Sequence, residues 1–188
     1  MLQRHAWCQR LAGVDLRRLV FLDETGAKTN MTRAFARARR GQRVIDYAPQ
    51  GHWNTTTLVA GVTVESALAP MVLDGPMDAL AFEAYVEHVL IPALPAHAIV
   101  VMDNLSPHKA AAVPRLLREA GAELWYLPPY SPDFNPIEQL WAKVKSILRR
   151  AKARTQEELC AAIATALAQV TPNDTSGFFD HAVVGIIN

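Results

Sequence analysis

Three acidic side chains, far apart in the sequence, stand where predicted secondary-structure elements begin or end. Asp23 directly follows the apolar run 19–22. Asp103 likewise follows the apolar run 98–102, and Glu138 lies in the first turn of a predicted helix. Carboxylates that converge without a cation repel one another, and Mg²⁺ relieves this while leaving coordination places for water and phosphate oxygens. The three acids therefore predict a site for two-metal phosphodiester cleavage.

Glu138 also has a purely structural interpretation. Four prolines within residues 127–141 fix φ and remove backbone donors, which predicts a stiff loop before the helix. Asn135 is a good N-cap, and Pro136 suits the first helical position. Glu138 is the third residue after Asn135, where a Glu is the ordinary partner in a capping box. These residues alone leave both interpretations open.

The order of the predicted elements indicates an α/β fold with a five-stranded mixed sheet flanked by helices. An antiparallel hairpin comes first, and crossover helices then return the chain to parallel strands. The expected strands are 19–22, 55–64, 68–73, 98–102 and 123–127, and the expected helices begin near 78, 106, 136 and 155, with short helices within 1–17 and 178–184. If the first and fourth strands are parallel neighbours, Asp23 and Asp103 lie side by side. Adjacent strand residues face opposite ways, so only one of Asp23 and Glu24 can face the site.

Composition predicts one cytoplasmic domain. The chain has 188 residues, of which 51% are hydrophobic, enough for a full core. No apolar run approaches the roughly 20 residues of a membrane helix, and residues 1–17 lack the apolar centre of a signal peptide. Cys8 and Cys160 have no metal-type spacing and are too few for a disulfide framework.

Charge is segregated although the net charge is only +1. Between Val44 and His108 there are seven acidic residues and no Lys or Arg. Two basic clusters flank this segment: Arg33, Arg37, Arg39, Arg40 and Arg43 before it, and Lys143, Lys145, Arg149, Arg150, Lys152 and Arg154 after it. The first cluster lies in residues 26–52, predicted to be an extended, irregular arm with turns near Gly41 and Gly51. The clusters indicate either a phosphate-binding face beside a metal site or two solvated surfaces.

Three blocks of sequence resemble the catalytic blocks of DDE transposases in the mariner superfamily, most closely the bacterial insertion sequence 630 type. They are FLDETG around Asp23, VMDNLSPHK around Asp103 and LPPYSPDFNPIEQLWAKVK around Glu138, with 34 residues between the last two acids. The resemblance runs from about residue 18 to the end of the Glu138 helix. It implies a ribonuclease-H-like fold and two Mg²⁺ ions, replaceable by Mn²⁺, held by the three acids. It also implies cleavage of double-stranded DNA at transposon ends and joining to a target at a TA dinucleotide.

The resemblance and the basic clusters together give the expected DNA contacts. Asn104 and His108 of the second block would orient Asp103 or contact the scissile phosphate, although a loop hydrogen bond and a helix start explain them equally well. Trp141 is expected in the core, whereas Lys145 suits a phosphate. The predicted DNA-binding residues are Arg37, Arg39, Arg40, Arg43, Asn104, His108, Lys143, Lys145, Arg149 and Arg150.

The resemblance also sets the expected organisation and partners. Residues 1–17 are interpreted as an N-terminal helical remnant and 18–188 as the catalytic domain, without the helix-turn-helix modules usual in such transposases. Those modules would either be supplied by a separate N-terminal DNA-binding segment or be lost in a truncated remnant. We expect a homodimer on DNA in the bacterial cytoplasm, associated with the nucleoid and not with a membrane. The alternatives are a catalytically silent DNA-binding remnant and a generic nuclease or resolvase of the same fold.

Overall fold

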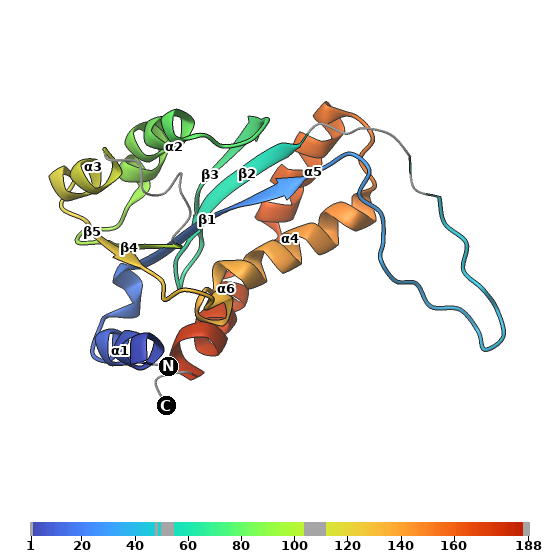
Figure 1. Cartoon of the computed structure of the whole chain (residues 1–188). Coiled ribbons are helices and arrows are strands. Elements are labelled where there is room, and N and C mark those ends of the chain that lie inside the picture. Colours follow the sequence, from blue (N-terminus) through green and yellow to red (C-terminus); the bar gives the residue numbers. More distant parts are fainter. Residues whose placement is uncertain (1, 48, 50–54, 104–111, 186–188) are drawn as a thin grey trace.

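A five-stranded mixed sheet runs through the centre of the molecule (Figure 1). The structure is a computed structural model and describes residues 2–47, 49, 55–103 and 112–185. The strands are β1 (Leu19–Ala27), β2 (Thr56–Val62), β3 (Ala67–Asp74), β4 (Ile99–Met102) and β5 (Glu123–Tyr126), in the spatial order β3-β2-β1-β4-β5. Strands β1, β2 and β3 pair antiparallel, whereas β4 is parallel to both β1 and β5. The predicted fold class, including the parallel pairing of the first and fourth strands, is confirmed.

Strand β1 is longer than the sequence indicated. Its parallel pairing with β4 ends at the pair Phe21–Val101, but its antiparallel pairing with β2 continues to the pair Ala27–Thr56. The β2 ladder satisfies the backbone groups of the second half of β1, so the strand continues past the apolar run. Asp23 therefore lies inside a strand rather than at its end, at the point where the parallel neighbour stops.

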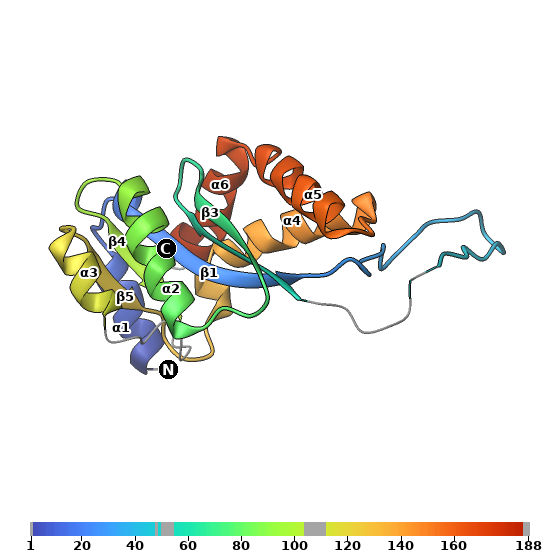
Figure 2. The ribbon, with the colours of Figure 1, turned by 90° about the horizontal axis from the view of Figure 1, so that it is seen from above.

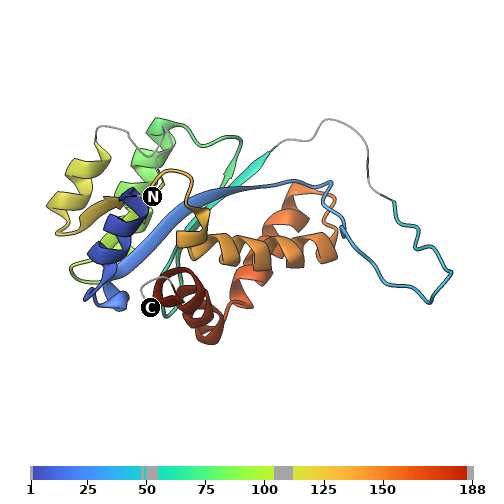
Figure 3. The same ribbon diagram turned by 60° about the horizontal axis from the view of Figure 1, so that its bottom comes forward.

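Helices cover both faces of the sheet. The helices are α1 (Leu2–Leu11), α2 (Ala79–Tyr85), α3 (Val113–Glu119), α4 (Ile137–Ala151), α5 (Gln156–Ala168) and α6 (Pro172–Phe179). Helices α1, α4, α5 and α6 pack on one face, as Figure 3 shows, and α2 and α3 pack on the other (Figure 2). Leu19 and Phe21 of β1 belong to the α4 side of the core and Leu22 to the α2 side. This alternation follows from the two-residue period of a strand.

The predicted helix starts are largely confirmed. The Asp78 carboxylate accepts a hydrogen bond from the Ala81 N–H at 2.8 Å, and Thr155 and Glu158 form a reciprocal capping box. The last helix begins earlier than predicted, because Thr171 caps α6 and a π-helical turn continues it over Asp180–Val184. The predicted start of the third helix near residue 106 lies outside the described residues. None of the described helices is long and apolar enough to cross a membrane.

Residues 33–47, which follow β1, project away from the body as a long arm (Figure 1). Residues 33–47 are exposed and form no regular strand or helix. A turn occurs where predicted, since the Gln42 N–H donates to the Arg39 carbonyl at 2.9 Å and Gly41 has a φ of +83°. This conformation is easy for glycine, which has no Cβ to clash. The second predicted turn, near Gly51, lies outside the described residues.

Candidate catalytic site

Asp23 and Asp103 occupy equivalent positions on neighbouring parallel strands. The register that pairs Leu19 with Ile99 and Phe21 with Val101 places Asp23 opposite Asp103 when it is continued. Both aspartates are half-buried. The two carboxylates therefore lie just beyond the last pair of one parallel ladder, although 79 residues lie between them in the sequence.

The period of β1 decides which of its two adjacent acids faces the site. Residues two apart in a strand share a face of the sheet. Asp23 therefore shares the face of Phe21, which packs on the α4 side, and Glu24 shares the face of Leu22 on the α2 side. Tyr85 of α2 packs on that same side, where burial and then the charge of Glu24 raise the pKa of the Tyr85 hydroxyl. The Glu24 N–H donates to Asp23 Oδ1 at 2.8 Å, which restrains the Asp23 side chain.

The N-terminus of α4 gives Glu138 no capping role. The Asn135 N–H, which a capping-box Glu would bind, donates instead to the Pro132 carbonyl at 3.0 Å. Asn135 is buried, and its side-chain oxygen accepts from the Ile137 N–H at 3.3 Å. The Glu138 side chain is exposed. The capping-box interpretation of Glu138 is therefore wrong, and this carboxylate is left to face the space beside the sheet.

One cavity brings the three acids together. It has a volume of about 490 Å³ and lies where α4 begins beside the sheet. Its walls are Asp23, Asp103 and Glu138 together with the loop residues Leu127, Pro128, Pro129, Tyr130, Ser131, Pro132 and Asn135. The prolines hold the loop in one backbone course because their φ is fixed. The three acids thus line a single open space that is walled mostly by a stiff loop.

The donor set fits hard divalent cations. Three carboxylates supply only oxygen ligands, which Mg²⁺ and Mn²⁺ prefer. Among the described residues no three His, Cys, Asp or Glu side chains stand close enough to enclose one ion. Such a closed cage is not what Mg²⁺ requires, because it usually takes one or two carboxylates and keeps several waters. An open cavity with acids on separate walls suits that mode of binding.

Arg4 of α1 holds the loop that walls this cavity. Its guanidinium donates to Ser131 Oγ at 3.0 Å and to both carboxylate oxygens of Asp133, at 2.9 and 2.5 Å. It also lies 3.9 Å from the centroid of the Phe134 ring. The hydrogen bonds from Arg4 lower the pKa of Asp133. Sequence reasoning missed Arg4, because nothing in a single sequence links two residues that are 129 positions apart.

Comparison with known proteins identifies the family. Residues 18–160 match the family described as DDE superfamily endonuclease. The chain belongs to this family. A transposase of the transposable element Tcb1 from Caenorhabditis briggsae is 26% identical over 131 residues, which are 64% of this chain and 48% of the relative. The chain thus spans about half the length of that relative.

Solved structures of Mos1 transposase share the fold of this DDE endonuclease domain. The Mos1 paired-end complex with the left transposon end matches with a TM-score of 0.76 at 18% identity, over 98% of this chain and 58% of the Mos1 chain. The Mos1 mariner catalytic domain matches with a TM-score of 0.67 at 15% identity, over 100% of this chain and 91% of that domain. Other Mos1 paired-end complexes are described with Mn or Mg. The resemblance to mariner transposases and the ribonuclease-H-like fold are confirmed.

Some basic residues of the domain are exposed, and others form ion pairs or hydrogen bonds within the fold. Arg37, Arg39, Arg40 and Arg43 are exposed along the arm. On α4, Arg150 is exposed, whereas Lys145 and Arg149 are half-buried. Asn104 and His108 lie outside the described residues. The predicted DNA-binding set therefore occupies two surfaces, the arm and α4.

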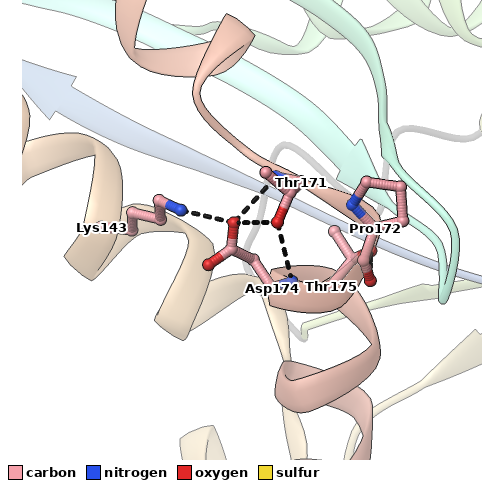
Figure 4. A network of polar contacts seen from close by, with 5 residues as sticks. All are labelled: Lys143, Thr171, Pro172, Asp174 and Thr175. Carbon is pink, nitrogen blue, oxygen red and sulfur yellow. Dashed lines mark hydrogen bonds and ion pairs between the residues drawn. The ribbon is translucent and has the colours of Figure 1, made fainter.

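Lys143 has a structural partner instead of an open position. Its ammonium forms an ion pair with Asp174 at the start of α6 (Figure 4). Thr171 also donates to the Asp174 carboxylate, from its hydroxyl at 2.7 Å and its N–H at 2.8 Å. Both side chains of the ion pair are about a quarter to a third exposed, at 30% and 25%. Lys143 therefore joins α4 to α6, and its place in the DNA-binding set stays a prediction.

The last two members of the second basic cluster anchor the arm. Lys152 forms an ion pair with Asp46 of the arm at 2.6 Å. Arg154 donates to the carbonyls of Thr29 and Met31 at 2.8 and 3.2 Å. Both residues follow α4, so the base of the arm is tied to the C-terminal end of that helix.

Proposed function

We propose that this DDE endonuclease domain cleaves DNA strands with divalent metal ions and transfers the freed 3′ end to a second DNA during transposition. The observation that carries the proposal is the single cavity lined by Asp23, Asp103 and Glu138. These acids come from β1, from the end of β4 and from α4, so only the folded chain assembles them. The family match and the fold shared with Mos1 transposase support the reaction type.

The chain's own residues would prepare the site in three ways. The paired strands β1 and β4 fix the spacing of Asp23 and Asp103, and the loop held by Arg4 fixes the start of α4. Glu138 itself lies in the first turn of α4, so the start of this helix places its carboxylate at the cavity. Asp23, Asp103 and Glu138 would hold two Mg²⁺ ions, or Mn²⁺ in their place, which supply an activated water and a counter-charge for the departing oxygen.

The proposed substrate is double-stranded DNA at transposon ends, with a TA-containing target for the transfer step. Phosphate contacts would come from the arm and from α4, through Arg37, Arg39, Arg40, Arg43, Lys145, Arg149 and Arg150. Asn104 and His108 complete the proposed set beside Asp103. Such contacts position DNA without reading its sequence and weaken steeply with salt.

Recognition of specific ends would need further protein surface. We propose that a separate N-terminal DNA-binding segment supplies it and that two copies of the chain act as a homodimer on paired ends. The expected place of action is the bacterial cytoplasm, at the nucleoid. The matched stretch is 48% of the Tcb1 transposase, which leaves room in that relative for such a segment.

The test is nicking of a supercoiled plasmid, and of a labelled duplex, by the purified chain in Mg²⁺, Mn²⁺ or EDTA. Wild type is compared with Glu138→Gln, which keeps the size of the side chain and removes its charge. Glu24→Gln is the matched control, since Glu24 follows Asp23 in β1 but faces the other side of the sheet. We expect metal-dependent nicking by wild type and Glu24→Gln, and none by Glu138→Gln.

The same assay separates the competing functions. Nicking followed by joining of a 3′-hydroxyl end to a second DNA supports a transposase, whereas nicking without joining supports a generic nuclease or resolvase. Equal nicking by wild type and Glu138→Gln would refute the assigned site. Metal-independent DNA binding without any nicking, also when a DNA-binding segment is supplied, would favour the silent remnant.

A further inference from the structure

Tyr130 has an unusual backbone conformation at the catalytic cavity. Its φ is +54°, in the left-handed region, and it is one of four non-glycine residues with positive φ in the described part of the chain. A bulky side chain rarely adopts this conformation, because Cβ comes too close to the backbone. Strain of this kind persists only where the surroundings impose it, and it concentrates at functional sites.

The ring of Tyr130 adds nothing to the packing that would explain the strain. Its side chain is 99% exposed, the highest value among the exposed large hydrophobic residues that the structure describes. Pro129 beside it is also exposed, whereas Pro128 and Ser131 on either side of this pair are buried. A fully exposed aromatic ring on a loop whose flanking residues Pro128 and Ser131 are buried indicates a role outside the folded chain itself.

The loop around Tyr130 is fixed independently of the ring. Ser131 Oγ donates to the Pro129 carbonyl at 3.2 Å, closing a tight turn with Tyr130 at its tip. Ser131 also accepts from Arg4, and its carbonyl accepts from the Phe134 N–H at 3.1 Å. The turn therefore presents the ring from a rigid base, which lowers the entropy lost when a ligand binds to it.

The position of the ring suggests what it binds. Tyr130 lines the same cavity as Asp23, Asp103 and Glu138, so a ligand on the ring would lie beside the phosphate that reacts there. The ring is flat and apolar, whereas the acids beside it are negative and repel anions. A nucleobase is the part of DNA that offers a neutral flat face to such a ring.

We propose that Tyr130 is a stacking platform for an unpaired nucleobase next to the scissile phosphate. This inference rests on the proposed DNA cleavage at the same cavity. Stacking would hold a frayed or extruded base out of the duplex, which gives the acids access to the backbone beside it. Because every base has a π-face, the contact would select unpaired over paired DNA rather than a particular sequence.

The test measures stacking without cleavage. Glu138→Gln serves as the background, and the probe is a duplex with a short single-stranded 3′ extension that carries 2-aminopurine, whose fluorescence falls on stacking. Tyr130→Phe keeps the ring, whereas Tyr130→Asn removes it and suits the left-handed backbone. We expect quenching with Tyr130 and Tyr130→Phe and its loss with Tyr130→Asn. Affinity for the extended duplex should fall about tenfold in Tyr130→Asn, with little change for a blunt duplex.

Two results would overturn the inference. One is unchanged quenching and affinity in Tyr130→Asn, and the other is a Tyr130→Phe variant that behaves like Tyr130→Asn, which would assign the effect to the hydroxyl. The melting temperature of Tyr130→Asn should be no lower than that of the Glu138→Gln background. A loss of binding would then not come from misfolding. The two proposals can also fail separately. If quenching depends on Tyr130 but the wild-type chain never nicks DNA, the stacking inference stands and the cleavage proposal fails.

Discussion

Arg4 and Asp133 form a bidentate ion pair across the loop that leads to Glu138. The two nitrogens of the Arg4 guanidinium lie 2.9 and 2.5 Å from the two carboxylate oxygens of Asp133. Arg4 belongs to α1, ahead of the residues 18–160 that match the DDE endonuclease family. Trp7 and Leu11 bury this helix in the α4 side of the core. The first helix therefore supports the loop that walls the acid-lined cavity as well as the fold.

Replacing Arg4 by Gln should impair cleavage more than it impairs folding. The side chains of the pair are 39% and 53% exposed, so water screens the pair and we expect only a small loss of stability. Misplacing Glu138 should lower cleavage per folded molecule roughly ten- to hundredfold. Arg10→Gln is the matched control, because Arg10 lies on the same helix and packs 3.6 Å from the centroid of the Trp125 ring.

Thermal unfolding and single-turnover nicking of the two Arg variants measure these effects. Cleavage rates are compared at equal concentrations of folded protein. If Arg4→Gln cleaves as fast as Arg10→Gln, the ion pair has no positioning role.

Asp103→Ala should abolish cleavage and leave the fold intact. The side chain is half-buried at a cavity shared with two other acids, so its removal relieves like-charge repulsion. We expect nicking to fall at least about a thousandfold, as for loss of a metal ligand, and the melting temperature to stay within a few degrees of wild type. A variant that fails to fold would instead make Asp103 a structural residue.

The Lys143–Asp174 ion pair predicts a stability that depends on pH in the acid range. Hydrogen bonds from Lys143 and from the hydroxyl and N–H of Thr171 lower the pKa of Asp174 from 3.8 to about 2. A carboxyl with a lowered pKa in the folded state stabilises the protein above its unfolded pKa, and this contribution is lost as pH falls from 3.8 to about 2. Lys143→Met should therefore lower the free energy of unfolding by about 1 kcal/mol at neutral pH.

Urea unfolding of wild type and Lys143→Met across this pH range provides the measurement. The difference between them should shrink below pH 3.8. Lys145→Met, on the same helix, is the control and should show no such trend. A difference that stays constant down to pH 2 would rule out the Asp174 carboxylate as its source.

Arg149→Ala combined with Arg150→Ala should weaken DNA binding and flatten its dependence on salt. Each lost contact to a duplex phosphate lowers the slope of log K against log[salt] by about 0.9. We expect a change of nearly two in this slope from titrations between low and physiological salt. Lys152→Met is the control, because Lys152 is already paired with Asp46. An unchanged slope in the double variant would remove α4 from the DNA-binding surface.

Much of the fold followed from local patterns in the sequence. The caps at Asp78 and Thr155 act over three residues, so they can be recognised without knowing the packing. The apolar runs before Asp23 and Asp103 likewise predicted two buried strands. The second half of β1 was missed, because its pairing with β2 rather than its own sequence makes it a strand. The boundary expected between residues 17 and 18 stays a prediction.

The sequence by itself determined the order of elements, the three acids and the family they resemble. These depend on residue type and short spacing, which the chain displays directly. Only the tertiary structure decided that Asp23 and not Glu24 faces the cavity, since that follows from the register of β1 against its neighbours. It also assigned Lys143 to Asp174 and Arg4 to Asp133, because these partners are 31 and 129 positions apart. Contacts at such separations form only when packing brings the elements together, so no local sequence pattern predicts them.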